Sequence, residues 1–534
     1  GWVHVTAGTF EEQVLVGADL TLQGAATNST VIVSPDDLAG SFTIGSSTYY
    51  PVVLAQDTAN VSVLDLTIDG AGKGNDNNRF VGLAYRNAGG DAVDLKVTGV
   101  RHTPLNGVQG GLGIYVQNDD GTARAVTITG CVVNDFQKNG ITVNSAAGTP
   151  LDATITGNTV TGAGVLSADD GDPAQNGIQV NGPDVVGLIG ENTVSGIAYD
   201  NTNASTPWVA TSILDFYTSV DVIDNVVFDG HVGVYKYSAA GQVALNELTI
   251  DKVGLEAYGI IATDPPQAVP SPVEVALDGA PAADKALVTV VVDGNTITLT
   301  GTDTVDTYGI FAYAGVTPED IDIAITGNTV TNFQYSTILY QYALDTGVFT
   351  NAVVNGNNLL GGEYAIATNI DAFTLDGSCN WYGDVAGPDA PGNPAPGQPM
   401  IDGDVFFTPW LDGAAPGGAC VLYGDDNIAV SDGPDCLTDG TTCTDVTVTF
   451  NRTNADPSRG VSTTFQLSPE LELCGPLGAS VTMATGAGAW LDGYTNTTMQ
   501  IYDNGGGSYT VDLAVLGSPC GPTTGGDLFT VRSE

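Results

Sequence analysis

A short phrase at residues 154–160, Thr-Ile-Thr-Gly-Asn-Thr-Val, constrains the fold of this chain more than any other feature. Its β-branched residues favour strands, and the Gly157-Asn158 pair tolerates the left-handed backbone that a sharp corner needs. The phrase returns at 325–330, and looser forms contain the asparagines Asn192, Asn225, Asn246, Asn295 and Asn357. Including Asn158 and Asn328, these asparagines are spaced by 34, 33, 21, 49, 33 and 29 residues. A unit that returns in this way predicts a solenoid, in which each coil packs against its neighbours.

Asparagine side chains at equivalent bends should lie one strand spacing apart, about 4.7–4.9 Å. At this distance the amides can hydrogen-bond along the solenoid axis, as asparagine ladders do in stacked β-structures. Cys131, in Thr-Gly-Cys-Val-Val at 129–133, takes the asparagine position of its coil. We therefore expect Cys131 to be a small buried residue of the ladder and not a nucleophile.

A second phrase, Gly-Ile-x-apolar, alternates with the bend at 140–143, 177–180, 259–262 and 309–312. Side chains alternate along a strand, so if the isoleucine points inward the fourth position points inward as well. Across the coils, the fourth position is expected to read Val143, Val180, Asp215, Lys236, Ala262, Ala312 and Tyr340. Asp215 and Lys236 would then be buried neighbours on adjacent coils, and we expect them to form an ion pair.

The third position of the same phrase is expected to face outward. It reads Thr142, Gln179, Leu214, Tyr235, Ile261, Phe311, Leu339 and Ala367. Five large apolar residues in succession, from Leu214 to Leu339, predict an exposed stripe about 20 Å long, the kind of patch that marks a contact surface. The stripe would bind another copy of the chain or a glycan, with Tyr235 and Phe311 as anchors. Alternatively, the proline-rich segment 263–285 or the C-terminal domain folds over it.

The opening strands and the two repeated phrases resemble those of right-handed parallel β-helix proteins of the pectate-lyase-like superfamily, with repeats of the carbohydrate-binding and sugar-hydrolase type. The resemblance covers residues 1–412 and implies an all-β fold whose first domain is a right-handed parallel β-helix. Segment 378–412 resembles the end of such proteins, where aromatic residues plug the core. It implies that Trp381 and Trp410 cover the last coil.

The pattern changes after a small-residue linker at 413–420. Alternating strands are predicted at 446–450, 463–467, 479–482 and 509–513, with turns between them. They predict a smaller antiparallel β-sandwich over 421–534, similar to immunoglobulin or cohesin modules and expected to be incomplete.

Five of the seven cysteines lie in the last part of the chain, at 420, 436, 443, 474 and 520. Clustered cysteines in a β-rich chain indicate an oxidising setting, so we expect an extracellular or cell-surface protein. Without Cys131, six cysteines allow fifteen connectivities. Proximity in the sequence favours the pairs Cys379–Cys420, Cys436–Cys443 and Cys474–Cys520.

Charge excludes some classes of partner. The chain has 13 Lys and Arg residues against 61 Asp and Glu residues, a formal net charge of −48. A field of this sign repels nucleic acid and anionic membranes. No apolar run reaches membrane-spanning length, so membrane insertion is not expected.

Seven of the thirteen cations lie within residues 73–138, near acidic loops, and are the candidates for a catalytic base. They are Lys73, Arg79, Arg86, Lys96, Arg101, Arg124 and Lys138. The arginine motif of pectate lyases is absent, as are the paired aspartates of polygalacturonases. The Gln-Asp-Thr signature of pectin methylesterases and the Asp-Pro-His motif of mannuronan epimerases are missing too. We therefore predict no catalytic residues and interpret the cations as solvated surface.

Two functions remain as hypotheses. The first is a non-catalytic extracellular structural or adhesive protein, a surface, sheath or filament subunit that associates with itself or contacts glycans. The alternative is a calcium-dependent polysaccharide lyase or epimerase acting on acidic glycans. Calcium is the one cofactor that the sequence suggests, because Asp169, Asp170 and Asp172 offer carboxylates in one turn. An ordinary acidic loop explains these three residues equally well.

Overall fold

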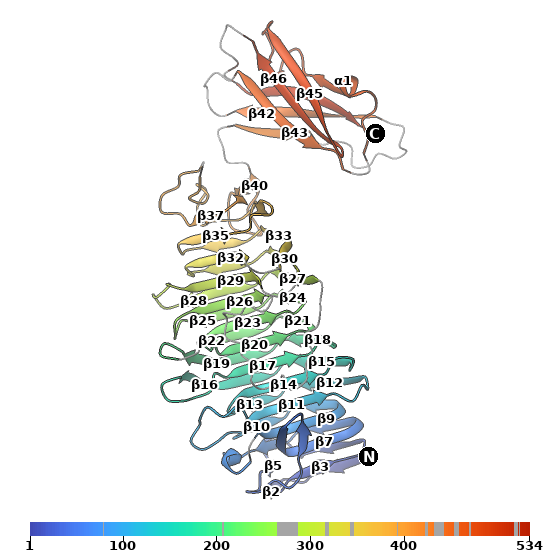
Figure 1. The fold of residues 1–534 in the computed structure, drawn as a ribbon, viewed down its shortest axis with the longest axis vertical. Coiled ribbons are helices and arrows are strands. Elements are labelled where there is room, and N and C mark those ends of the chain that lie inside the picture. The colour runs from blue at the N-terminus through green and yellow to red at the C-terminus, as the bar shows by residue number, and fades with distance from the viewer. Residues whose placement is uncertain are drawn as a thin grey trace. The chain divides into compact units, whose positions relative to one another are not determined.

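The computed structural model describes residues 1–77, 79–204, 208–263, 287–315, 320–341, 347–391, 393–421, 426–431, 443–452, 459–468, 471–516, 522 and 524–533. They form two compact units, 1–421 and 422–534. The first unit is a parallel β-solenoid, and the second consists of smaller antiparallel sheets (Figure 1). The predicted all-β fold class is confirmed.

Three parallel ladders of strands build the solenoid, and a typical coil adds one strand to ladder 1, then ladder 2, then ladder 3. Ladders 1 and 2 belong to one 26-stranded sheet because two long strands, β7 (Ser47–Leu64) and β9 (Phe80–Val93), bend through both. A short strand, β6 (Phe42–Ile44), folds back on β7 as a hairpin and completes this sheet. One 3₁₀ turn, η1 (Lys73–Asn75), precedes β9.

Besides β7 and β9, ladder 1 contains β3 (Val14–Val16), β11 (Leu112–Asn118), β14 (Asn139–Ser145), β17 (Asn176–Asn181), β20 (Thr211–Phe216), β23 (Val232–Tyr237), β26 (Ala257–Thr263), β29 (Thr307–Ala314), β32 (Tyr335–Gln341), β35 (Tyr364–Thr368) and β37 (Met400–Asp402). Ladder 2 contains β1 (Trp2–His4), β4 (Leu20–Gln23), β12 (Arg124–Thr129), β15 (Leu151–Thr156), β18 (Val185–Gly190), β21 (Ser219–Ile223), β24 (Gly241–Ala244), β27 (Leu287–Asp293), β30 (Asp320–Thr326), β33 (Phe349–Asn355), β36 (Leu375–Asp376) and β38 (Val405–Phe406). Ladder 3 is a separate 12-stranded sheet of β2 (Gly8–Glu11), β5 (Thr30–Val33), β8 (Thr67–Asp69), β10 (Lys96–Thr98), β13 (Val132–Asn134), β16 (Thr159–Ser167), β19 (Thr193–Asp200), β22 (Val226–Gly230), β25 (Glu247–Asp251), β28 (Thr296–Thr300), β31 (Thr329–Thr331) and β34 (Asn358–Leu360).

Inward side chains of the three ladders form one continuous apolar core from Val16 to Trp410. The Gly-Ile-x-apolar phrase lies on ladder 1, where Ile141 and Val143 of β14 are in register with Ile178 and Val180 of β17. All four side chains are fully buried. Burial of one face of every strand therefore fixes the register, since a slip by one residue would turn that face to solvent.

The corner between ladders 2 and 3 carries the Gly-Asn bend. The residue that makes the turn has a left-handed φ between 51° and 68° in eleven successive corners, from Asp65 to Cys379. Glycine adopts this conformation without steric cost, which explains why it occupies five of these corners. The buried residue that follows each turn forms a continuous row: Leu66, Leu95, Cys131, Asn158, Asn192, Asn225, Asn246, Asn295, Asn328, Asn357 and Asn380.

Hydrogen bonds along this row confirm the predicted asparagine ladder. The backbone N–H and the Nδ2 of Asn158 both donate to Oδ1 of Asn192, at 3.0 and 2.9 Å. The same two bonds recur from coil to coil as far as Asn380. Cys131 has a free thiol whose pKa burial raises to about 12, and its backbone N–H donates to Asn158. A thiol with so high a pKa is not a nucleophile at neutral pH, as expected.

The predicted buried ion pair is also confirmed. The Lys236 Nζ lies 2.5 Å from Oδ2 of Asp215, and both side chains are fully buried. The ammonium also donates to the backbone oxygens of Val220 and Ala240, and the Thr218 hydroxyl donates to Asp215. All three ammonium donors are therefore satisfied inside the core.

The last coil is covered by the segment that was predicted to be a plug. Tyr382 and Trp410 are buried in the solenoid core, whereas Trp381 is only partly buried. Strand β39 (Trp410–Leu411) pairs with β40 (Cys420–Val421), and the predicted Cys379–Cys420 disulfide is present. The expected linker 413–420 therefore belongs to the first unit.

The second unit has two antiparallel sheets that share one apolar core. One sheet contains β41 (Asp426–Val430), β42 (Thr444–Arg452), β47 (Gly526–Ser533) and β44 (Val481–Met483). The other contains β43 (Gly460–Gln466), β46 (Ser508–Val515) and β45 (Thr497–Gly505). The strand predicted at 479–482 begins only at Val481, because a helical turn, α1 (Leu477–Ser480), precedes it.

Candidate functional site

An open groove lies where β7 and β9 bend from ladder 1 to ladder 2. Its volume is about 710 Å³, and it is lined by residues of three successive coils: Asp57, Thr58, Ala59, Asn60, Gly90, Asp91, Thr122, Ala123, Arg124, Ala125 and Thr127. Small and polar residues predominate. A groove that crosses several coils can follow an extended ligand along the solenoid axis.

One wall of the groove is fixed by Asp19. Its Oδ1 accepts hydrogen bonds from the backbone N–H groups of Ala59 and Asn60, each at 2.9 Å. The Asn60 hydrogen bond is the main reason that the pKa of Asp19 lies below its usual range. This carboxylate therefore works as an anchor for the 57–60 turn.

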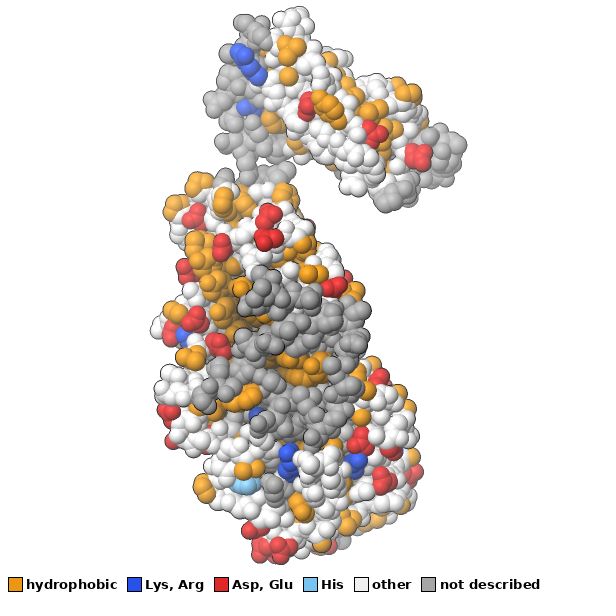
Figure 2. Space-filling view, in the orientation of Figure 1, with side chains coloured by type: hydrophobic (Ala, Val, Ile, Leu, Met, Phe, Trp, Pro, Cys, Tyr) orange, Lys and Arg blue, Asp and Glu red, His pale blue; other side chains and the backbone are white. Residues whose placement is uncertain are grey.

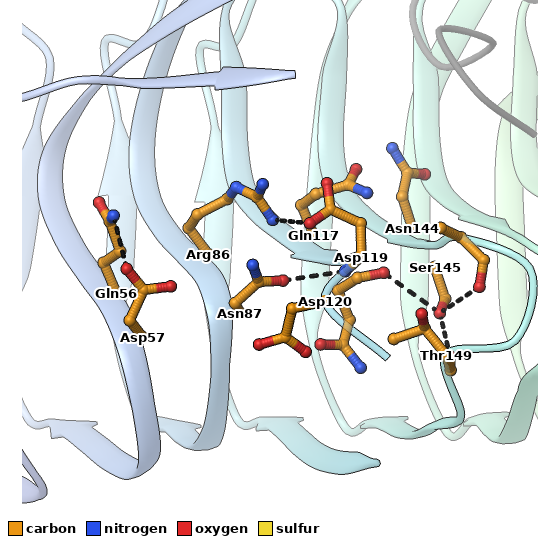
Figure 3. A network of polar contacts seen from close by, with 12 residues as sticks. Gln56, Asp57, Arg86, Asn87, Gln117, Asp119, Asp120, Asn144, Ser145 and Thr149 are labelled. Atoms are coloured by element: carbon orange, nitrogen blue, oxygen red, sulfur yellow. Dashed lines mark hydrogen bonds and ion pairs between the residues drawn. The ribbon is translucent and has the colours of Figure 1, made fainter. Parts of the chain in front are cut away.

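Polar side chains of neighbouring coils form a connected network beside the groove (Figure 3). Arg86 on β9 forms an ion pair with Asp119 in the turn after β11, and Asn87 accepts a hydrogen bond from the Asp119 backbone at 2.9 Å. The Arg86 guanidinium also lies 6.0 Å from the ring centre of Phe42 in the β6–β7 hairpin. Three elements therefore hold this guanidinium in one orientation.

The second guanidinium of the network, Arg124, lines the groove itself. Its two terminal nitrogens contact the two oxygens of Asp120 at 2.6 and 2.7 Å, and Oδ1 of Asn118 accepts a further bond at 2.5 Å. The Arg124 hydrogen bond holds the pKa of Asp120 well below its usual range. Both terminal nitrogens are occupied by this bidentate pair, so the guanidinium is poorly placed to take a proton from a ligand.

The groove offers little else for acid–base chemistry. Its carboxylates are Asp57, which accepts a hydrogen bond from Gln56 at 2.8 Å, and Asp91, which accepts one from the Ser62 hydroxyl at 2.9 Å. The arrangement suits hydrogen bonding to hydroxyl groups better than proton transfer.

The predicted metal residues Asp169, Asp170 and Asp172 lie in the turn after β16. Oδ2 of Asp169 accepts a hydrogen bond from Asn203 at 2.9 Å, and Oδ2 of Asp172 accepts one from the Ser167 backbone at 3.4 Å. Within the described residues, no cluster of three or more His, Cys, Asp or Glu residues could hold a metal ion. Calcium binding at this turn stays a prediction, alongside the alternative of an ordinary acidic loop.

The prediction of an exposed apolar stripe is wrong. Leu214, Tyr235 and Ile261 do lie in register on ladder 1 and form a cluster separate from the solenoid core, but they are almost completely buried. Phe311 joins this cluster and is half-buried. The segment 264–286, which includes most of the proline-rich loop considered as a cover, lies outside the described residues.

Leu339 was placed on the wrong face. It is in register with Ala312 and packs in the core, whereas Ile338 is in register with Phe311. The coil reads Ser336-Thr337-Ile338-Leu339, so a threonine stands where the phrase has isoleucine. Aligning the wrong isoleucine shifts the register by one residue and exchanges the faces, which also misplaced Tyr340.

Two of the five remaining cations of the group form ion pairs with carboxylates. Lys73 contacts Glu11 at 3.0 Å and Asp36 at 2.9 Å, and Arg101 contacts Asp135 at 2.5 Å. Figure 2 shows the Lys and Arg side chains as scattered groups on a surface with many Asp and Glu residues. Lys138 is buried beside a small cavity.

The cysteines of the second unit pair differently from the prediction. Cys443 forms a disulfide with Cys474, so neither Cys436–Cys443 nor Cys474–Cys520 can form alongside it. Cys436 and Cys520 lie outside the described residues. The favoured pairing relied on proximity in the sequence, whereas the fold brings the start of β42 close to the segment before α1.

Comparison with known proteins gave no relative: no protein-family model matches the chain, and no curated protein matches it. Within the described residues, no helix has the length and apolar character needed to cross a membrane. Two disulfides indicate that the chain matures in a non-reducing environment.

Proposed function

We propose that this protein is a non-catalytic, structural or adhesive β-solenoid of the cell exterior that contacts glycans through the groove of β7, β9 and β12. The observation that carries the proposal is the bidentate Arg124–Asp120 pair, which places a charged guanidinium in the groove but withholds it from acid–base chemistry. The resemblance of the repeats to pectate-lyase-like β-helices supports a carbohydrate ligand, and immunoglobulin- or cohesin-like modules remain the best comparison for the second unit.

Polysaccharides suit the groove for a physical reason. Hydroxyl groups of a sugar can donate to Asp57 and Asp91 and can accept from the side chains of Asn60 and Thr122. The groove follows successive coils, so neighbouring sugar units can meet similar contacts. The same rigid rod is well suited to a surface, sheath or filament subunit that associates with other copies.

The lyase or epimerase hypothesis is kept as the alternative. It requires Arg124 or Lys138 to take a proton from a uronate, with calcium bound to the substrate. The expected result is that the purified chain, with calcium and a panel of polyuronates, releases no unsaturated product. Product release that disappears in Arg124→Ala or Lys138→Ala would overturn the non-catalytic proposal.

Binding is tested on a glycan array. Ala123 lines the groove and is exposed, so Ala123→Trp should fill the groove without disturbing the core. Ala25, exposed in the turn after β4, provides the matched control Ala25→Trp. We expect Ala123→Trp to abolish retention of the bound glycans and Ala25→Trp to leave it unchanged. Glycan binding that survives Ala123→Trp would place the contact elsewhere, and the absence of binding by the original chain would refute the proposal.

A further inference from the structure

A cavity of about 250 Å³ that is partly open to solvent lies beside the start of β14, separate from the groove. Residues of four successive coils line it, at 107–109, at Lys138, at 171–174, and at Tyr199 with 208–209. The residues that give it chemical character are Gln109, Lys138, Asp172, Tyr199 and Trp208. The volume is below the roughly 300 Å³ at which pockets for drug-sized ligands begin, so the cavity suits one small molecule.

Buried amides hold the loops around the cavity in place. Gln137 donates to Asn106 and to the backbone of Val108, at 3.1 and 2.8 Å. Gln175 donates to the backbone of Phe136 at 2.8 Å, and Asn201 donates to the backbone of Trp208 at 3.1 Å. The cavity walls are therefore fixed before any ligand arrives, which lowers the entropic cost of binding.

The cavity combines one cation, one anion and two aromatic rings. Lys138 is buried, and its ammonium donates to the backbone oxygen of Ala174 at the cavity wall. Asp172 contributes the opposite charge, and the Tyr199 hydroxyl donates to the Asp172 backbone oxygen at 3.3 Å. Trp208 is partly buried and adds an aromatic surface. Lys138 and Asp172 line the same cavity, whose volume fits one small molecule.

We propose that this cavity binds a small zwitterion, an α-amino acid with an apolar side chain. Its carboxylate would face the Lys138 ammonium, its ammonium would face the Asp172 carboxylate, and its side chain would pack on Trp208 and Tyr199. Charge-assisted hydrogen bonds of this kind are stronger than neutral ones.

The charge of the whole chain separates this ligand from the other candidates. A formal charge of −48 disfavours the approach of an anion, including a uronate, to any part of the surface. A cation would be repelled locally by Lys138, and a neutral sugar would use neither charge. A zwitterion has no net charge for the long-range field to act on, and it matches both local charges.

Isothermal titration calorimetry tests the proposal with L-leucine and L-phenylalanine as probes. We expect one molecule to bind per chain. N-acetyl-leucine, which has no ammonium, and leucinamide, which has no carboxylate, should bind at least tenfold more weakly. Equal binding of either derivative, or the absence of heat with both amino acids at millimolar concentration, would overturn the proposal. Binding of glucuronate in place of the amino acids would identify an acidic-sugar site instead.

Variants locate the site. Lys138→Met removes the charge and keeps a similar length, so it should weaken leucine binding at least tenfold. Lys96→Met, on the partly exposed outer side of β10, is the matched control and should bind normally. If Lys138→Met fails to fold, Trp208→Leu provides the second test, because it keeps both charges and should weaken phenylalanine binding in a folded chain. Unchanged binding in a folded Lys138→Met or Trp208→Leu variant would refute the assignment.

Discussion

The Asp215–Lys236 pair shows how one residue position can be inferred from sequence. Strict alternation along β20 and β23 places both side chains inward, and burial without compensation would be costly, so pairing follows. The same alternation gave a wrong prediction for Leu339 on β32. There, Thr337 takes the place of the isoleucine that was used to align the coils. Inward and outward side chains can therefore be predicted only for strands in which the isoleucine of the Gly-Ile-x-apolar phrase fixes the register.

Replacement of Lys236 by methionine should destabilise the solenoid by about 3–5 kcal/mol, because Asp215 would keep a buried charge without its partner. The double variant Asp215→Leu/Lys236→Met should recover most of that loss, since no charge then remains in the core. Chemical denaturation of the three variants measures both values. Similar stability of the single and the double variant would show that the buried charge is not the cause.

His231 should make stability depend on pH. Burial lowers its pKa from 6.5 to about 4, and its Nε2 donates to the Glu256 backbone oxygen at 2.7 Å. Between these two pH values the unfolded histidine binds a proton and the folded one does not. Stability should therefore fall as the pH drops from 6.5 to 4, by about 3 kcal/mol, and this contribution should change no further below pH 4.

The measurement is the free energy of unfolding across this pH range for the original chain and for His231→Gln. The variant lacks the titrating group, so the difference between the two curves isolates the histidine. Parallel curves would show that the pKa of His231 is the same in the folded and the unfolded chain.

At the scale of the element, the corner between ladders 2 and 3 explains how much of the fold was predictable. The Gly-Asn phrase appears in the sequence only where glycine makes the turn, and six corners use other residues, including Leu245 and Cys379. Asn380 was not recognised as part of the ladder because segment 378–412 was interpreted as the terminal plug, although its Oδ1 accepts from Asn357 in the same way as at the earlier asparagines. The left-handed φ of the corner residue is therefore constant from coil to coil, whereas the type of residue that adopts it varies.

Leu245 is the least favourable of these corner residues. It has a φ of 58° and is 57% exposed, so its side chain gains little from packing. Leu245→Asn should stabilise the solenoid by about 0.5–1 kcal/mol, because asparagine tolerates the left-handed region better than leucine. Leu255→Asn is the control, since Leu255 is 46% exposed and has no left-handed φ. Thermal unfolding that shifts equally in both variants would indicate a general effect of polarity.

The groove and the cavity could not be predicted because the groove combines residues of three coils and the cavity residues of four. Arg124 and Lys138 were singled out by their charge, but the sequence does not show that Arg124 pairs with Asp120 or that Lys138 is buried. Loop conformations depend on individual contacts, such as those of Gln137 and Gln175, and these have no repeating pattern. The repeated phrases therefore predict the strands of the solenoid, whereas the groove and the cavity depend on loops whose sequences do not repeat.

At the scale of the molecule, the two units can be stabilised independently. The Cys443–Cys474 disulfide spans 31 residues of the second unit. Its loss in Cys443→Ser/Cys474→Ser should destabilise that unit by about 3–4 kcal/mol through the greater entropy of the unfolded chain. Differential scanning calorimetry should show one transition moving while the other stays in place. Movement of both transitions would show that the units unfold together.

The asparagine ladder also gives the solenoid an electrical direction. From Asn158 to Asn357, each Nδ2 donates to the asparagine of the next coil, and each Oδ1 accepts from the previous coil. Aligned bonds of this kind polarise one another, and their dipoles add along the axis instead of cancelling. The interior row is shielded from salt, unlike the charged surface. A further coil would continue this row of hydrogen bonds only if its asparagine had the same orientation as the others. The ladder therefore restricts lengthening of the solenoid to coils that run in the same direction.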